Sequence, residues 1–220
     1  MNYPTPTPVI FDLITHIEPS SSKHIRMWEQ TGRKIKKKSD HMTIDGLKGS
    51  LDCLNRERLG LLNRLASIAP VELYRKPGLQ RWSLVQVLQH LVLAEREVLQ
   101  HLPDMADLVP RKQYPYHFIS YAVVLLVLKW GIPVPVPSSA MVPDGNTTLK
   151  RIRTQWDRNF DWLTAYVNGL SIETARRAVF IHPVCGPLTI TQALYIGRLH
   201  LFVHNRQINR ILQQHEMQKA

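Results

Sequence analysis

The sequence of 220 residues is poor in cysteine. Cys53 and Cys185 are its only two, and they stand far apart in the chain. This scarcity excludes a small disulfide-rich scaffold and a zinc site built from cysteines, and it favours a protein of the reducing cytoplasm. The first eight residues contain no basic leader, and Asp12 breaks the short apolar stretch after them, so we expect no secretory signal.

Long apolar runs are also lacking. The longest, residues 118–130, is interrupted by Lys129 and falls short of the roughly 20 residues that a membrane-spanning helix requires. A proline-alternating stretch, residues 133–137, follows it directly. We therefore expect no membrane span and interpret the run as a buried or pocket-lining segment, with a role at a membrane surface as the alternative.

Acidic residues are few, because 17 Asp and Glu stand against 28 Lys and Arg, which gives a net charge of +11. Such an excess favours anionic partners, among them nucleic acid, acidic membranes and anionic metabolites. The densest basic cluster, residues 33–38, has no aromatic residue between its lysines that could stack on bases. We therefore do not expect nucleic acid as a partner, although electrostatic binding through this cluster is the alternative.

The chain otherwise has the composition of a globular protein, with 44% hydrophobic and 20% charged residues, and its length suits one main domain. Residues 1–42 carry several prolines, a serine run and the basic cluster, and we predict a loosely ordered extension there. Residues 43–220 form the predicted domain. In this domain apolar residues recur every three or four positions in four long stretches, which is typical of amphipathic helices.

The start signals of these helices are clear. Ser83 with Gln86, and Thr189 with Gln192, have the spacing of capping boxes before the second and fourth helices. We expect the first helix to run from Thr43 to Pro70, and the third to follow Asn146 or Thr147. Strand signals are short and isolated. The prediction is an all-α four-helix bundle with a long crossover between its second and third helices.

Two histidines in the fourth helix suggest chemistry. His200 and His204 are one turn apart, so that both imidazoles lie on one face and one metal ion can accept a nitrogen from each. Leu201 stands where a zinc protease would have glutamate, which disfavours that class of enzyme. The spacing alone is a weak signal, because histidines that bond to each other or to the backbone also explain it.

A third ligand must come from another helix. His90 lies beside the apolar stripe of the second helix and can face into the bundle. The alternative is a boundary histidine that bonds to water or to a neighbour. Gln86 and Glu97 are candidates for partners of the site or for pocket residues, but solvent-facing roles are the simpler explanation for both. The candidate metal ligands are therefore His90, His200 and His204.

Three motifs together resemble a known family. Residues 82–91, residues 182–189 and the pair His200 and His204 are similar, in order and spacing, to the DinB-like superfamily of helical-bundle proteins. The resemblance covers residues 44–214 and implies an up-down-down-up four-helix bundle. It also implies that one histidine of the second helix and two of the fourth bind a divalent metal, and here these are His90, His200 and His204. Family bundles often pair, so a homodimer is a further expectation.

The resemblance further implies a reaction class. Some members of that family are S-transferases that use low-molecular-weight thiols, so we expect a thiol or an electrophile as the small-molecule substrate. Three neutral imidazoles leave a Zn, Ni or Fe ion with open positions that can activate a thiol or a water, which gives S-transferase-like or hydrolase-like chemistry. No residue is assigned as general acid or base. The alternative is a non-catalytic helical-bundle protein, with a stress or binding role and no metal.

Overall fold

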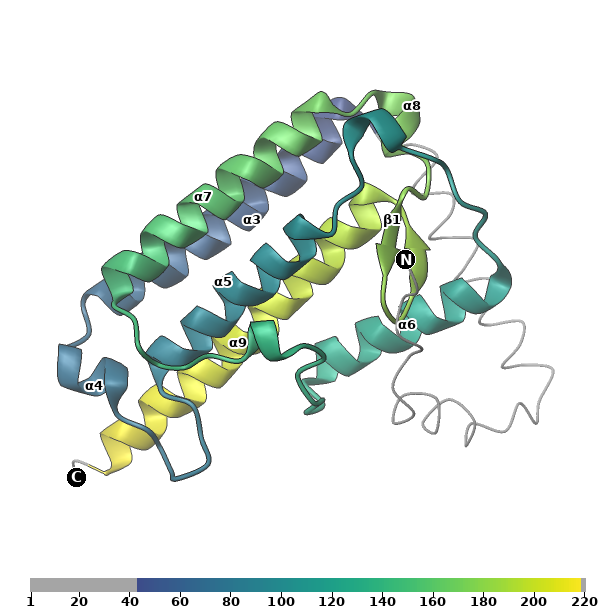
Figure 1. The fold of residues 1–220 in the computed structure, drawn as a ribbon. Coiled ribbons are helices and arrows are strands. Elements are labelled where there is room, and N and C mark those ends of the chain that lie inside the picture. The colour runs from purple at the N-terminus through teal and green to yellow at the C-terminus, as the bar shows by residue number, and fades with distance from the viewer. Residues whose placement is uncertain (1–42, 219–220) are drawn as a thin grey trace, which may run out of the picture.

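The computed structural model describes residues 43–218, and the predicted extension of residues 1–42 lies outside them. Four long helices form a bundle: α3 (Ile44–Ala66), α5 (Leu84–Gln100), α7 (Leu149–Gly169) and α9 (Ile190–Met217). In Figure 1, α3 and α9 run in one direction and α5 and α7 in the other, which is the up-down-down-up order. The predicted all-α bundle with a long crossover between its second and third long helices is confirmed.

The capping residues fix where the long helices begin. The Ser83 hydroxyl accepts the backbone N–H of Gln86, whose side chain accepts the N–H of Ser83 in return. Thr189 and Gln192 repeat this arrangement before α9. Both capping boxes are therefore confirmed. Helix α7 is capped by Thr148, one or two residues later than expected.

The core lies between the four helices, with α5 packed on α7 and α9, and α3 on the same two helices. Its largest fully buried side chains on these helices are Leu62, Leu65, Leu84, Leu88, Ile152, Ile190 and Ile208. The three- and four-residue spacing of apolar residues in the second helix predicts Val98 on its core face, and this prediction is wrong: Val98 is 58% exposed, whereas Leu99 is buried. Leu99 follows Leu88 by eleven residues, or about three turns, so both lie on the same buried face of α5. Val98 lies outside this face.

The first helix ends earlier than the sequence indicated. Helix α3 stops at Ala66, and Pro70 begins a separate short helix, α4 (Pro70–Tyr74). Proline suits the first turn of a helix because the N–H that it lacks has no helical partner there. Pro70 is therefore a start signal in this chain as well as a stop.

The crossover between α5 and α7 is structured. It contains α6 (Pro115–Trp130) and two short 3₁₀ helices, η1 (Met105–Asp107) and η2 (Ser139–Met141). Helix α6 packs against α9 at the edge of the bundle (Figure 1). Within residues 43–218, no helix combines the length and the hydropathy that crossing a bilayer would take.

A small hairpin precedes α9, after the short helix α8 (Ile172–Ala175). Strands β1 (Phe180–His182) and β2 (Gly186–Leu188) pair antiparallel, with Phe180 opposite Leu188. The sequence has only an isolated strand signal near residue 180. It does not predict the partner strand β2, because Gly186 and Pro187 are poor strand formers. The pairing supplies the backbone partners that an orphan strand would lack.

The turn of this hairpin is held by its own side chains. His182 Nδ1 accepts the backbone N–H groups of Val184 and Cys185, both at 3.2 Å. Cys185 is fully buried, and burial raises the pKa of its thiol to about 12. Residues 182–187 thus form a proline-containing turn around a buried cysteine.

Replacing Gly186 should destabilise the fold. Gly186 has a φ of 70°, and a Cβ built there would lie 2.8 Å from Cδ2 of His117, whose own Nδ1 accepts the N–H of Tyr114. Gly186→Ala should therefore lower the free energy of unfolding by about 1–3 kcal/mol, measured by urea denaturation.

The matched control is Gly60→Ala. Gly60 lies within α3, and a Cβ built there meets nothing within 4 Å, so this variant should be more stable by about 0.5–1 kcal/mol. Equal effects of the two substitutions would contradict the strain assigned to the hairpin.

Candidate metal centre

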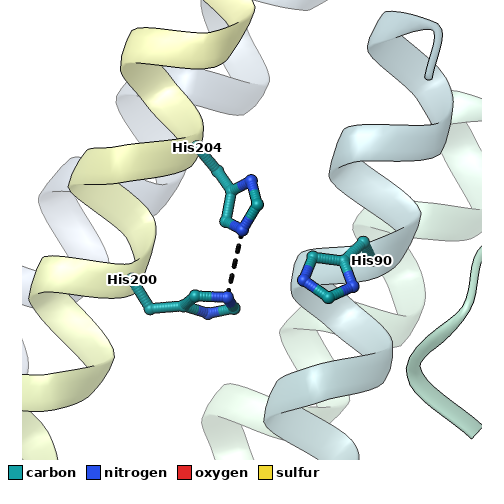
Figure 2. Close-up of side chains that lie close together, drawn as sticks. All are labelled: His90, His200 and His204. Carbon is teal, nitrogen blue, oxygen red and sulfur yellow. Dashed lines mark hydrogen bonds between the residues drawn. The ribbon is translucent and has the colours of Figure 1, made fainter. Parts of the chain in front are cut away.

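Two neighbouring helices bring three histidines together. His90 projects from α5, and His200 and His204 project from one face of α9, one turn apart. Figure 2 shows the three rings lying between the two helices, with His90 across from the pair. A capping box fixes the first residue of each helix, and the packing of α5 on α9 brings these side chains together.

The imidazoles are close enough to share one ion. Nε2 of His200 and Nε2 of His204 lie 3.1 Å apart, and one ligand nitrogen of each histidine lies within 4.8 Å of the others. The His90 ring centroid is 5.4 Å from that of His200 and 4.9 Å from that of His204. This group of three is one that could hold a metal ion.

Partners outside the group orient two of the rings. Nδ1 of His90 lies 2.8 Å from the carbonyl oxygen of Met141, and a carbonyl can only accept, so this nitrogen carries the proton. Nδ1 of His204 lies 2.8 Å from Oε1 of Gln207 and donates in the same way. In the neutral rings Nε2 of both residues is then free to act as a ligand, which is the tautomer that outer partners impose at metal sites.

The third ring completes the network. With Nδ1 of His204 protonated, its Nε2 is an acceptor, so Nε2–H of His200 donates to it across 3.1 Å (Figure 2). An ion bound at this point would replace that hydrogen bond and require the proton of His200 to move to Nδ1. The donor set therefore fits a divalent metal: three neutral nitrogen ligands, two of them already held in the ligating tautomer.

Electrostatics keeps the cluster neutral. Burial lowers the pKa of His200 to about 3, and the neighbouring His204 and His90 lower it further. Burial likewise lowers the pKa of His204 to about 4, against the opposing hydrogen bond to Gln207. The pKa of His90 is also lowered by burial, and its bond to Met141 opposes this in part. Neutral imidazole is the form that binds a metal, so all three rings have the required charge state at pH 7.

One aromatic ring contacts the cluster, and the helix surface one turn before the histidine pair is uncovered. The Trp82 ring lies 4.9 Å from that of His90, centroid to centroid, and His90 is buried, whereas His200 and His204 are half-buried. One turn before His200, a Cβ at Gly197 would meet no atom within 4 Å. Gly197 is itself exposed, so the surface of α9 is uncovered one turn before the pair.

The other candidate residues lie elsewhere. The side chain of Gln86 is used in its capping box, and Glu97 lies 3.9 Å from Nδ1 of His101. Among the described residues, no aspartate, glutamate or cysteine joins the three histidines. No general acid or base is identified at the cluster.

Sequence reasoning missed two residues that orient the rings. Gln207 follows His204 by three positions on the same helix, and this spacing could have revealed it. The Met141 carbonyl belongs to η2, 51 residues from His90 in the chain. No local sequence pattern predicts which backbone oxygen will accept from a distant histidine.

Comparison with models of protein families identifies the family of this chain. A sequence model described as the DinB superfamily matches residues 54–208, a segment that includes all three histidines and the whole crossover. No curated protein matches this chain. No solved structure matches it either.

The metal-free protein should lose stability in acid through this cluster. Unfolded histidines have a pKa of about 6.5, whereas those of His200 and His204 are about 3 and 4 in the folded protein. Below pH 6.5 the unfolded chain therefore binds protons that the folded chain excludes. The free energy of unfolding should fall by up to about 1.4 kcal/mol per pH unit for each histidine as pH drops from 6.5 toward 4.

Urea denaturation in the presence of a chelator, repeated from pH 7.5 down to pH 5, measures this slope. His200→Leu should show a shallower dependence on pH than the parent protein, because one of the titrating groups is gone. An unchanged slope in this variant would contradict the assignment.

Proposed function

Because this chain belongs to the DinB superfamily and brings three imidazoles together between α5 and α9, we propose that it is a metal-dependent enzyme. His90, His200 and His204 would hold a divalent ion. The observation that carries the proposal is the convergence of three neutral ring nitrogens, from segments more than 100 residues apart, within 4.8 Å of one another.

The ligand set limits the ion and its chemistry. Imidazole nitrogens suit zinc, nickel and iron, and three neutral ligands leave the full charge of +2 and at least one open position. Such an ion lowers the pKa of a bound water toward about 7 and favours the deprotonated form of a bound thiol. Met141 and Gln207 keep the protons of His90 and His204 on Nδ1, away from the ion.

The composition of the site favours transfer of a thiol over hydrolysis. Hydrolysis of an amide needs a group that protonates the leaving nitrogen, and no carboxyl group of the described residues joins the histidines. Attack of a thiolate on an electrophilic carbon needs no such acid when the leaving group departs as a stable anion. We therefore favour an S-transferase-like reaction between a low-molecular-weight thiol and an electrophile, in the reducing cytoplasm, over a hydrolase-like one.

One observation favours a second function. The hydrogen bond between His200 and His204 satisfies both Nε2 atoms without an ion, and Met141 and Gln207 satisfy two further ring nitrogens. A polar cluster of this kind can simply be part of a stable core. The second candidate is thus a non-catalytic bundle, with a stress or binding role, in which the three histidines are structural.

Metal analysis separates the two functions. The full-length protein, purified without a histidine tag and loaded with zinc, nickel or ferrous iron, should retain about one ion per chain after desalting. His200→Ala should remove it, since a ligand is lost. His101→Ala is the matched control, because His101 lies just after α5 with an exposed side chain and should leave the metal content unchanged.

Gln207→Ala provides a test that spares all three ligands. Without Oε1 of Gln207 the tautomer of His204 is no longer fixed, and metal affinity should fall by about 10–100-fold while the fold persists. Retention of a full equivalent by His200→Ala, or no metal in the parent protein, would overturn the proposed site and leave the structural cluster.

An activity assay distinguishes the two reactions. The metal-loaded protein is mixed with glutathione or cysteine and a chloronitroarene, and separately with a nitrophenyl ester. Thiol conjugation should exceed the uncatalysed rate and fall at least about tenfold in His204→Ala but not in His101→Ala. Ester hydrolysis with no conjugation would favour the hydrolase-like reaction instead.

A further inference from the structure

Helix α6 is apolar on both of its sides. Its inner side buries Tyr121 and Ala122 toward α9. The opposite side carries a stripe with three- and four-residue spacing: Tyr116, Ile119, Val123, Leu126 and Trp130. Trp130 is 65% exposed, Tyr116 59% and Ile119 42%. The interpretation of residues 118–130 as buried holds for the inner side only, and we call the outer stripe the α6 face.

The chain after α6 extends this surface. Gly131, with a φ of 66°, ends the helix, and Ile132 and Val134 are 44% and 48% exposed. Helix α6 lies outside the four-helix bundle, so none of its four long helices covers the α6 face (Figure 1). An exposed apolar surface of this kind, bordered by polar residues, is typical of an interaction site.

Charge around the α6 face has one sign. Residues 108–143, which include α6, and residues 174–215, which include most of α9, contain no aspartate or glutamate. The same two segments contain eight lysines and arginines, and they meet where α6 packs on α9. Two of these arginines form ion pairs, Arg177 with Glu173 and Arg198 with Glu57. The remaining excess of positive charge makes this side of the molecule cationic as well as apolar.

The cations lie at the two ends of α6, beside aromatic rings. Before the helix, the Lys112 ammonium lies 5.1 Å from the centroid of the Tyr114 ring. After it, Arg206 donates to the carbonyl of Lys129, and a Cβ built at Gly131 would lie 4.0 Å from Nη2 of Arg210.

These cations are not neutralised within the described part of the chain. Its ion pairs join other residues, and none involves Lys112, Lys129, Arg206 or Arg210. Their charges are therefore available to an external anionic surface.

We propose that the α6 face docks on an anionic phospholipid bilayer, with α6 lying flat in the headgroup region. The apolar stripe would enter the boundary of the acyl chains, Trp130 and Tyr116 would sit at the interface, and the flanking lysines and arginines would contact lipid phosphates. The exposed apolar stripe favours a membrane over nucleic acid, because a phosphate backbone offers nothing to cover Ile119.

Vesicle co-sedimentation of the full-length protein tests this. The protein should bind vesicles of phosphatidylcholine mixed with phosphatidylglycerol, bind phosphatidylcholine alone weakly, and dissociate as salt rises. Trp130→Ala and Ile119→Asp should each weaken binding by about tenfold, since each removes apolar surface from the interface. Arg206→Glu should weaken it only on anionic vesicles.

The matched control is Trp162→Ala. Trp162 is 45% exposed on α7, so this variant removes an exposed tryptophan from another helix and should bind as the parent does. All variants keep the basic cluster of residues 33–38, so a loss in the α6 variants is not attributable to it. Circular dichroism confirms that each variant is folded.

Three outcomes would overturn the proposal. The first is no binding to anionic vesicles, or binding that the α6 variants do not change. The second is an oligonucleotide that binds more tightly than vesicles and competes with them. The third is a dimer in solution that Ile119→Asp converts to monomer while vesicle binding is absent, because a second copy of the chain then covers the α6 face.

Discussion

Three imidazoles held neutral between α5 and α9 are the constraint on which the rest of the site depends. A buried ring nitrogen without a partner costs on the order of 1–3 kcal/mol, so each must find one within the fold. His90 finds the carbonyl of Met141, His204 finds Gln207, and His200 bonds to His204. Satisfying His90 thus fixes the end of the crossover against α5, and the long insertion becomes part of the site wall.

Local interactions within the chain contribute to this arrangement. The capping boxes at Ser83 and Thr189 set the first residue of α5 and α9, and hence the direction in which each histidine points. The hairpin before α9 adds a second restraint, because Cys185 and Leu188 are buried directly ahead of the helix start. Residues far from the cluster therefore determine its geometry, which is how a bundle supports a site in its interior.

The helices, their starting residues and the three histidines could be predicted because periodicity and caps are local signals and because the order of three motifs resembles a family. Other features had no such signal. The exposure of Val98 depends on which neighbours cover the end of α5, and the role of Met141 depends on a backbone oxygen that any residue would supply. The hairpin was missed because Gly186 and Pro187 resist the strand pattern, and burial of residues 118–130 was inferred from hydropathy, which does not reveal a second uncovered side.

The left-handed Gly131 has a consequence for communication across the molecule. It ends α6, and only ten residues further on the carbonyl of Met141 accepts the hydrogen bond of His90. This short tether joins a surface helix to the ring orientation in the interior. If a ligand on α6 shifted this segment and so altered metal binding, the metal would have to alter the affinity for that ligand by the same factor.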